Sequence, residues 1–411
     1  MPPPAKKKLT PKSAVLVKKY ERPIRLAFIS LVAALCVVFL LHTPPSRGPR
    51  PGHGPALNHI TPVDPQSLLK PHADVAQKVH YPPANDRVRE RATFVTLARN
   101  SDLWSLVPSI RHVEDRFNRR FHYDWVFLND KPFDQEFIRV TSALVSGTAK
   151  YGVIPSEHWS VPDWIDQDRA AEARSQMVQD QVIYGDSVPY RHMCRFESGF
   201  FFQHELLADY EFYWRVEPDI RLFCDIHYDV FRFMKLNNKK YGFILSLSEY
   251  EKTIPTLWAT TKQFMHKFPQ YVHKNNLLDF VSDDQGESYN MCHFWSNFEV
   301  GSLDFWRGDA YQAYFEYLDR AGGFFYERWG DAPVHSIAAS LFLDKSELHF
   351  FDGFGYYHPD FYACPVEEDI RIQNQCTCNI ADDHTWFEYY FCTRKYFQAQ
   401  RLALPPGVKP A

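Results

Sequence analysis

The sequence of 411 residues lacks the signatures that mark several common classes of enzyme. It contains no Gly-rich phosphate-binding loop, no G-x-S-x-G segment, and no Ser, His and Asp in the order of a hydrolase triad. The net charge is only -4, so nothing in the charge balance calls for nucleic acid or an acidic polymer as a partner. There is no internal repeat and no N-x-S/T sequon. The chemistry of the chain must therefore be sought outside these motifs.

One apolar run stands near the N-terminus. Leu26 to Leu41 is apolar except for Ser30. As a helix it spans roughly 24 Å against a bilayer core of about 30 Å, and Arg25 and His42 can lengthen it by snorkelling. Lys and Arg are frequent before the run and do not recur until Arg47. The positive-inside rule then predicts a cytosolic tail at residues 1–25, a transmembrane signal-anchor helix at 26–41 and a lumenal remainder.

A cleaved signal peptide is the alternative reading of this run. No small-x-small cleavage pattern follows it directly, which favours the uncleaved anchor. The anchor is short, and a short anchor suits a thin membrane of the early secretory pathway better than the plasma membrane.

Residues 42–91 are dense in Pro and Gly, notably in TPPSRGPRPGHGPALNHITPVDP. Such a segment cannot hold a helix or a sheet ladder, so we interpret it as an extended stem. From Ala92 the texture changes, and no second Pro/Gly linker follows. Residues 92–411 are therefore predicted to form one large domain.

The chain has eight cysteines, of which Cys36 lies in the predicted anchor. The other seven would be in an oxidising lumen, where disulfides are expected, and their odd number leaves at least one thiol unpaired within the chain. A metal role for the tail cysteines is weak because Cys376 and Cys378 lack the usual zinc spacing. We predict disulfides among four cysteines near the C-terminus: Cys364, Cys376, Cys378 and Cys392.

The start of the predicted domain has an α/β pattern. The segment ATFVTLARN from Ala92 reads as a buried strand, Asp102 to Phe117 has helical spacing, and Trp125 to Asp130 reads as the next strand. Ligands of such folds bind at the carboxyl ends of the strands, where Arg99 and Asn100 stand after the first strand. We therefore predict a single α/β nucleotide-binding domain, with Arg99 and Asn100 as ligand contacts.

Further elements are predicted by the same spacing. Strands are expected at Phe212–Val216, Tyr241–Leu247 and Leu348–Phe351, and helices near Gln263–Phe268, Asp309–Ala321 and Ala332–Leu343.

An acidic pair follows one of these strands. Glu217 and Asp219 come directly after Phe212–Val216, where two carboxylates could hold a divalent cation such as Mn²⁺ or Mg²⁺ against a diphosphate. An acidic strand-to-turn pair without any ligand is the alternative interpretation.

Three further residues are candidates for chemistry. Glu299 stands among Phe294, Trp295 and Phe298, a costly setting for a carboxylate unless it is paired or functional. Asp331 precedes Ala-Pro and an apolar run, so an N-cap role competes with a functional one. His358 lies in a segment rich in Gly and aromatic residues, although a lone histidine is usually not a ligand.

Aromatic residues make up 16% of the chain and gather after residue 90. Their rings could pack on the apolar face of a sugar, and a large aromatic core is an equally good interpretation for most of them.

At these stretches the chain closely resembles the fungal family of Golgi α-1,2-mannosyltransferases. The resemblance covers roughly residues 92–397 together with the anchor and stem. Seven blocks carry it: ATFVTLARN, VEDRFNRRFHYDWVFLND, YRHMCRFESGFFF, YWRVEPDI, HFWSNFEV, GGFFYERWGDAPVHS and GYYHP. It implies a GT-A-like fold with a mixed central sheet, and retaining transfer of mannose from GDP-mannose to a mannoside 2-hydroxyl with Mn²⁺.

The resemblance also implies roles for single residues. The metal-contacting Glu of the E-P-D motif falls on Glu217, and the metal-binding His of the G-Y-x-H segment falls on His358. The candidate nucleophile of S-N-F-E falls on Glu299. The Tyr near the reacting sugar falls on Tyr190, and the Asp that could bind or deprotonate the acceptor hydroxyl falls on Asp331.

Beyond single residues, the resemblance implies a single-pass type II protein of the Golgi membrane with a mannosylated glycoprotein as acceptor, O-linked, N-linked or both. Two other functions stay open. A catalytically silent lectin-like or scaffold protein would keep the aromatic cleft, and a hydrolase would use two carboxylates. The joint presence of Glu217, Glu299, Asp331 and His358 argues against the first. The anchor and stem layout argues against the second.

Overall fold

The computed structural model describes residues 79–83 and 86–410. The chain divides into two units at Thr61 and Pro62, and every described residue belongs to the second. The predicted tail at 1–25, the anchor at 26–41 and most of the stem lie outside the described residues. Within the described ranges, no helix has the length and apolar character needed to span a bilayer.

The main element is a mixed sheet of seven strands in the order β10-β6-β9-β4-β1-β2-β3. All neighbouring pairs are parallel except those of β9, which runs antiparallel to both β4 and β6. The strands of this sheet are β1 Ala92–Leu97, β2 Asp124–Asn129, β3 Ala149–Val153, β4 Phe212–Arg215, β6 Tyr241–Phe243, β9 Glu299–Ser302 and β10 Leu348–Phe350. The α/β class and the mixed sheet expected from the sequence are thus confirmed.

Two small sheets accompany it. One has the order β12-β11-β5, and the other pairs β7 with β8. Their strands are β5 Arg221–Leu222, β7 Ser246–Ser248, β8 Cys292–Phe294, β11 Tyr356–His358 and β12 Phe361–Ala363.

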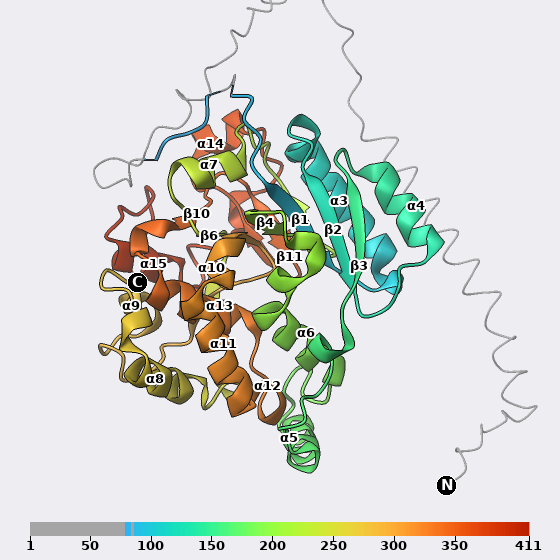
Figure 1. Ribbon diagram of the computed structural model, residues 1–411. Coiled ribbons are helices and arrows are strands. Elements are labelled where there is room, and N and C mark those ends of the chain that lie inside the picture. Colours follow the sequence, from blue (N-terminus) through green and yellow to red (C-terminus); the bar gives the residue numbers. More distant parts are fainter. Residues whose placement is uncertain (1–78, 84–85, 411) are drawn as a thin grey trace, which may run out of the picture. The chain divides into compact units, whose positions relative to one another are not determined.

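Both faces of the main sheet are buried because its strands alternate apolar residues between two cores. In β1, Phe94 packs into one core and Val95 into the other. Figure 1 shows α3 and α4 together beside β2 and β3, and α8, α11, α12 and α13 together in another part of the unit. The helices are α3 Leu103–Arg116, α4 Gln135–Leu144, α5 Gln167–Gln179, α6 Val188–Gly199, α7 Val230–Leu236, α8 Leu257–Lys267, α9 Leu278–Val281, α10 Leu303–Arg307, α11 Asp309–Ala321, α12 Gly323–Tyr326, α13 Asp331–Phe342, α14 Glu368–Gln373 and α15 Thr393–Gln400.

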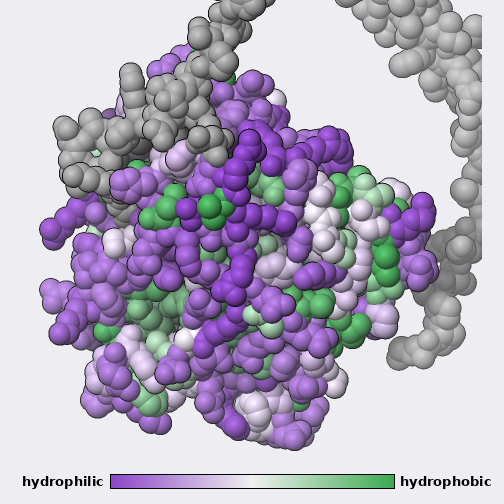
Figure 2. Space-filling view, turned by 45° about the horizontal axis from the view of Figure 1, so that its top comes forward, coloured by the Kyte–Doolittle hydropathy of each residue, from purple (hydrophilic) through white to green (hydrophobic). Residues whose placement is uncertain are grey.

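Most of the aromatic side chains lie in the two hydrophobic cores. Rings pack against one another on both sides of the sheet, as Phe94 does on Trp125 with centroids 4.6 Å apart and Phe243 on Phe294 at 4.1 Å. The face of the molecule in Figure 2 is largely hydrophilic, with hydrophobic residues in small separate groups.

Most predicted elements are found, with three corrections. The strand predicted at Tyr241–Leu247 is broken into β6 and β7, because the chain leaves the main sheet to pair with β8. The helix predicted near Gln263–Phe268 is the second half of α8. The N-cap of α13 is Gly330 and not Asp331, whose side chain makes no cap hydrogen bond.

The end of the predicted stem packs on α7. The Tyr81 ring lies 5.0 Å from that of Tyr228 and 5.2 Å from that of Phe233. Arg232 pairs with Asp86 at 3.0 Å and with Glu90 at 2.8 Å. This part of the segment is therefore joined to the folded unit by aromatic and ionic contacts.

All four tail cysteines form disulfides, but only Cys364–Cys378 lies within the tail. The other two bridges, Cys224–Cys376 and Cys292–Cys392, tie the tail to the sheet region. The prediction of bridges among the four is correct for Cys364 and Cys378. It is wrong for Cys376 and Cys392, because the folded chain brings them to Cys224 and Cys292, which are distant in sequence. Among the described residues, Cys194 is the free cysteine.

Candidate active site

Arg215, the last residue of β4, is the centre of the site. Its guanidinium donates to Asp331 Oδ2 with Nη1 2.5 Å away, donates to Glu217 through Nη2, and lies 3.8 Å from Glu197 Oε2. Burial alone would lower the pKa of Arg215, but the carboxylates of Glu197, Glu217 and Asp331 outweigh it and raise the pKa well above its ordinary value. One permanent cation thus organises three carboxylates that would otherwise repel one another.

Glu217 and His358 meet at the open side of this cluster. His358 ends β11, and its Nε2 lies 3.4 Å from Glu217 Oε2, with both side chains about a quarter exposed. Burial would raise the pKa of Glu217, but Arg215 and His358 outweigh it and lower the pKa to about 2. The structure therefore joins the two residues predicted as metal ligands, and Glu217 is ionised at any physiological pH.

Asp331 begins α13 and faces the sheet. Besides the guanidinium of Arg215, it accepts a hydrogen bond of 2.8 Å from Ser296 Oγ. Burial would raise its pKa, yet Arg215 and His335 together lower it. The carboxylate is thus held ionised by contacts across the site, which explains why it does not cap its own helix.

Glu299 begins β9, opposite Arg215 in the β4–β9 ladder, and its side chain is 1% exposed. Both of its carboxylate oxygens are engaged. Oε1 accepts from the Tyr213 hydroxyl, and Oε2 accepts from the Tyr241 hydroxyl at 2.9 Å and lies 2.9 Å from His335 Nδ1. Both carboxylate oxygens of Glu299 are therefore held by neighbouring side chains within the fold.

Tyr190 lies in the first turn of α6 and is half-buried between two side chains. Its ring is stacked on that of Tyr184 with centroids 4.7 Å apart, and the Arg328 guanidinium lies 4.9 Å from its centre. Tyr184 is exposed and has a left-handed backbone, with φ of 57°. Two stacked rings thus lie beside a buried cation close to the start of α13.

Arg99, Asn100 and Asp219 were predicted to contact the donor or its cation. In the structure their hydrogen bonds go to residues outside this cluster. Arg99 is exposed and pairs with Asp102 at 3.1 Å. Asn100 joins the loops after β1 and β2, since its Nδ2 donates to Pro132 O at 3.1 Å. Asp219 is exposed in a turn with φ of 62°, and the side chain that contacts Glu217 from β11 is His358. Arg99 and Asn100 do stand after the carboxyl end of β1, as expected.

Sequence reasoning missed Arg215, Glu197 and His335. The signal for Arg215 was present, since it is a charged residue inside the apolar strand FYWRV, the same anomaly that singled out Glu299. Glu197 and His335 lie within helices α6 and α13 and carried no comparable signal.

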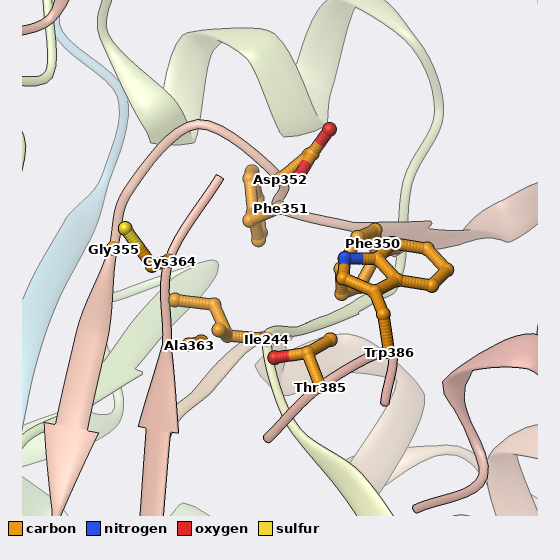
Figure 3. A pocket seen from close by; sticks show the side chains of 9 residues that line it. All are labelled: Ile244, Phe350, Phe351, Asp352, Gly355, Ala363, Cys364, Thr385 and Trp386. Carbon is orange, nitrogen blue, oxygen red and sulfur yellow. The ribbon is translucent and has the colours of Figure 1, made fainter. Parts of the chain in front are cut away.

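Figure 3 shows a small pocket beside β11 and β12. Nine residues line it: Ile244, Phe350, Phe351, Asp352, Gly355, Ala363, Cys364, Thr385 and Trp386. None of the predicted site residues is among them. Its lining is mainly apolar. The pocket is therefore not a second candidate for the active site.

The central strand β4 ends in a cluster of Arg215, His358 and several carboxylates, and comparison with known proteins gives both the glycosyltransferase class and the family. Residues 63–401 match the family model described as glycolipid 2-alpha-mannosyltransferase, and the chain belongs to this family. The resemblance inferred from the seven sequence blocks is thereby confirmed.

Curated relatives match over most of their length. The chain is 61% identical to the probable mannosyltransferase KTR3 of Saccharomyces cerevisiae over 405 residues, which is 98% of this chain and 99% of the relative. It is 64% identical to the alpha-1,2 mannosyltransferase KTR1 of the same yeast, over 78% of this chain and 81% of the relative.

Solved structures match as well. Core-mannan synthase A (CmsA/Ktr4) of Aspergillus fumigatus, crystallised in an Mn/GDP form, has a TM-score of 0.74 at 39% identity, over 82% of this chain and 94% of that one. The mannosyltransferase Ktr4p of S. cerevisiae, in complex with GDP, has a TM-score of 0.75 at 34% identity, over 82% and 88%. The described unit thus has the fold of these mannosyltransferases.

Proposed function

We propose that the chain is a retaining α-1,2-mannosyltransferase that moves mannose from GDP-mannose to the 2-hydroxyl of a mannoside. The observation that carries this proposal is the Glu217–His358 pair beside Arg215, at the end of a central strand, in a chain that belongs to the mannosyltransferase family. The name of the KTR1 relative and the Mn and GDP in the CmsA crystal support the linkage, the metal and the nucleotide.

The residues present fit Mn²⁺. A carboxylate oxygen and an imidazole nitrogen are ligands that this ion accepts, and Glu217 and His358 would hold it. Among the described residues, no group of three or more His, Cys, Asp and Glu side chains could hold a metal. The remaining ligands would therefore come from the donor diphosphate and water, and when bound the ion supplies positive charge to the leaving GDP.

The transfer breaks the bond between the mannose anomeric carbon and the diphosphate, and it forms a bond from that carbon to the acceptor oxygen. The acceptor hydroxyl must lose a proton. Asp331, held ionised beside Arg215, is the candidate to bind that hydroxyl and take the proton. Tyr190 would lie against the reacting sugar, because its ring stands near the start of α13.

Glu299 would act by its charge. The anomeric carbon becomes positively charged in the transition state, and a fixed carboxylate nearby lowers that energy. Because both of its oxygens accept hydrogen bonds, direct attack by Glu299 would require Tyr213, Tyr241 or His335 to let go of one oxygen. The buried geometry thus favours attack by the acceptor from the face of the departing diphosphate over double displacement.

The cellular setting is proposed on the sequence alone. We place the chain in the Golgi membrane as a single-pass type II protein, with mannosylated glycoproteins of the O-linked or N-linked kind as acceptors. The basis is the apolar run Leu26–Leu41, the basic residues before it and the family to which the chain belongs.

A donor screen tests the proposal. The purified full-length chain is incubated with Mn²⁺, an α-mannoside and one nucleotide sugar at a time. We expect transfer from GDP-mannose that is lost in EDTA and restored by excess Mn²⁺. Transfer from UDP-sugars but not from GDP-mannose would disprove the donor, and undiminished activity in EDTA would disprove the metal. Binding of mannosides without any transfer would favour the lectin-like alternative.

A further inference from the structure

Among the described residues, His335 is the one buried histidine whose two ring nitrogens both contact residues of the candidate active site, Glu299 and Glu197. It lies one turn after Asp331 on α13 and is wholly buried, stacked on Trp306 with ring centroids 4.3 Å apart. Its Nδ1 lies 2.9 Å from Glu299 Oε2, and its Nε2 lies 3.1 Å from the backbone oxygen of Glu197.

The partners of His335 determine its protonation. A carbonyl oxygen only accepts hydrogen bonds, so Nε2 must carry a hydrogen to bond the Glu197 carbonyl. An ionised carboxylate also only accepts, so Nδ1 must carry a hydrogen to bond Glu299. His335 and Glu299 together therefore carry one more proton than a neutral histidine and an ionised glutamate would carry.

The other contacts of Glu299 show which partner is charged. Trp306 Nε1 donates to the Tyr213 oxygen at 2.9 Å, which leaves the Tyr213 hydroxyl hydrogen to point at Glu299 Oε1. The Tyr241 hydroxyl donates to Oε2. Donors thus converge on both oxygens, an arrangement that stabilises the ionised form of a carboxylate. The proton accordingly belongs to His335.

We propose that His335 is an imidazolium that acts as a positioning residue, keeping Glu299 ionised and oriented beneath the reacting sugar. The proposal rests on the function proposed above, and it adds a residue that never touches substrate. Four titratable groups face His335 from the elements packed on it: Glu299 on β9, Asp331 on its own helix, Arg215 on β4 and Tyr311 on α11.

The electrostatic surroundings agree with this assignment. Burial alone would lower the pKa of His335, but the charges of Glu299 and Asp331 outweigh burial and the repulsion by Arg215, and they raise the pKa above its ordinary value. Arg215 bonds to Glu217 and Asp331, whereas the basic side chain bonded to Glu299 is His335. A second buried cation reduces the excess of negative charge under the sugar.

Nitrogen NMR of the full-length chain labelled in histidine tests the protonation directly. His335 is assigned by the signals that disappear in His335→Gln, or in His335→Asn if the first variant does not fold. At pH 7.5 we expect two similar ring-nitrogen shifts, the mark of an imidazolium. Two widely separated shifts, the mark of a neutral ring, would overturn the proposal. This readout does not depend on activity, so it stands even if the chain transfers no mannose and the proposed function fails.

A double-mutant cycle tests whether His335 acts through Glu299. We expect His335→Gln to lower kcat by about 10- to 100-fold, with KM for GDP-mannose changed less than about threefold. In a Glu299→Gln background the same change should cost less than about threefold, because the partner is already lost. Equal losses in both backgrounds, or a fall in GDP affinity parallel to a fall in melting temperature, would mean a merely structural role. The matched control is His349→Gln, since His349 packs among Phe233 and Phe351 in the other core.

Discussion

The guanidinium of Arg215 forms an ion pair with Asp331, with Nη1 2.5 Å from Oδ2. Both side chains are less than a tenth exposed. The same guanidinium holds Glu217 with its other nitrogen. One arginine thus joins the carboxylate proposed for the metal to the one proposed for the acceptor, and it fixes the distance between the two halves of the reaction.

Replacing Arg215 with Met should destabilise the fold by about 3–5 kcal/mol, because it leaves buried carboxylates without their cation. Denaturant unfolding of the full-length chain measures this. Arg195→Met is a matched control, since Arg195 forms a buried pair with Asp319 at 2.7 Å outside the cluster. We expect both variants to lose stability and only Arg215→Met to lose transfer in the fraction that stays folded. A fully stable Arg215→Met chain would contradict this account of the site.

Glu217→Gln and Glu299→Gln should fail in different ways. A ligand of the metal contributes to donor binding, so Glu217→Gln should weaken both Mn²⁺ and GDP-mannose binding as well as turnover. The carboxylate of Glu299 is expected to lower the energy of the transition state and not that of the bound donor, so Glu299→Gln should lower kcat by about a hundredfold or more with little change in donor affinity. Calorimetry and initial rates distinguish them. Near-normal kcat in Glu299→Gln would remove that residue from the catalytic set and turn attention to Asp331 and Tyr190.

The pH dependence of stability should expose Glu197. Burial raises the pKa of this carboxyl to about 7, despite the nearby charge of Arg215, whereas in the unfolded chain it titrates near 4.5. The folded state binds the proton more tightly, so this group lowers stability as pH rises from about 4.5 to 7. Glu197→Gln should be more stable than the unmodified chain at pH 8, by on the order of 1–3 kcal/mol, and equally stable at pH 4. An identical stability difference at both pH values would exclude this titration.

Mass mapping under non-reducing conditions should find three bridges: Cys224–Cys376, Cys292–Cys392 and Cys364–Cys378. Cys194 is buried and should react with an alkylating agent only after unfolding. Bridges confined to neighbouring tail cysteines would show that the tail is not joined to the sheet as described.

Local sequence patterns predicted the elements with strong periodicity better than those formed by long-range strand pairing. The buried strand β1 and helix α11 have strong periodicity, and α11 begins and ends where the spacing placed it. Strand β9 was not predicted, because its sequence, Glu-Val-Gly-Ser, has neither alternation nor strand propensity and is strand only by pairing with β4 and β6.

The site was predictable where chemistry left an anomaly in the sequence or the family left a motif. Glu217, His358, Glu299 and Asp331 were selected in this way, and the structure bonds Glu217 and Asp331 to Arg215 and His358 to Glu217. His335 was not predictable, since a histidine in an apolar helix is ordinary until its partners are known. Asp219 was selected by its spacing from Glu217, but the left-handed turn leaves it exposed.

The structure of the product tests the central claim most directly. The full-length chain is incubated with Mn²⁺, GDP-mannose labelled with ¹³C in the sugar and an α-mannoside acceptor, and the product is read by NMR; Glu217→Gln is the control for background transfer. The account predicts labelled mannose in α configuration on the 2-hydroxyl of the acceptor. Labelled mannose in β configuration, on another hydroxyl, or released only as free sugar would contradict it.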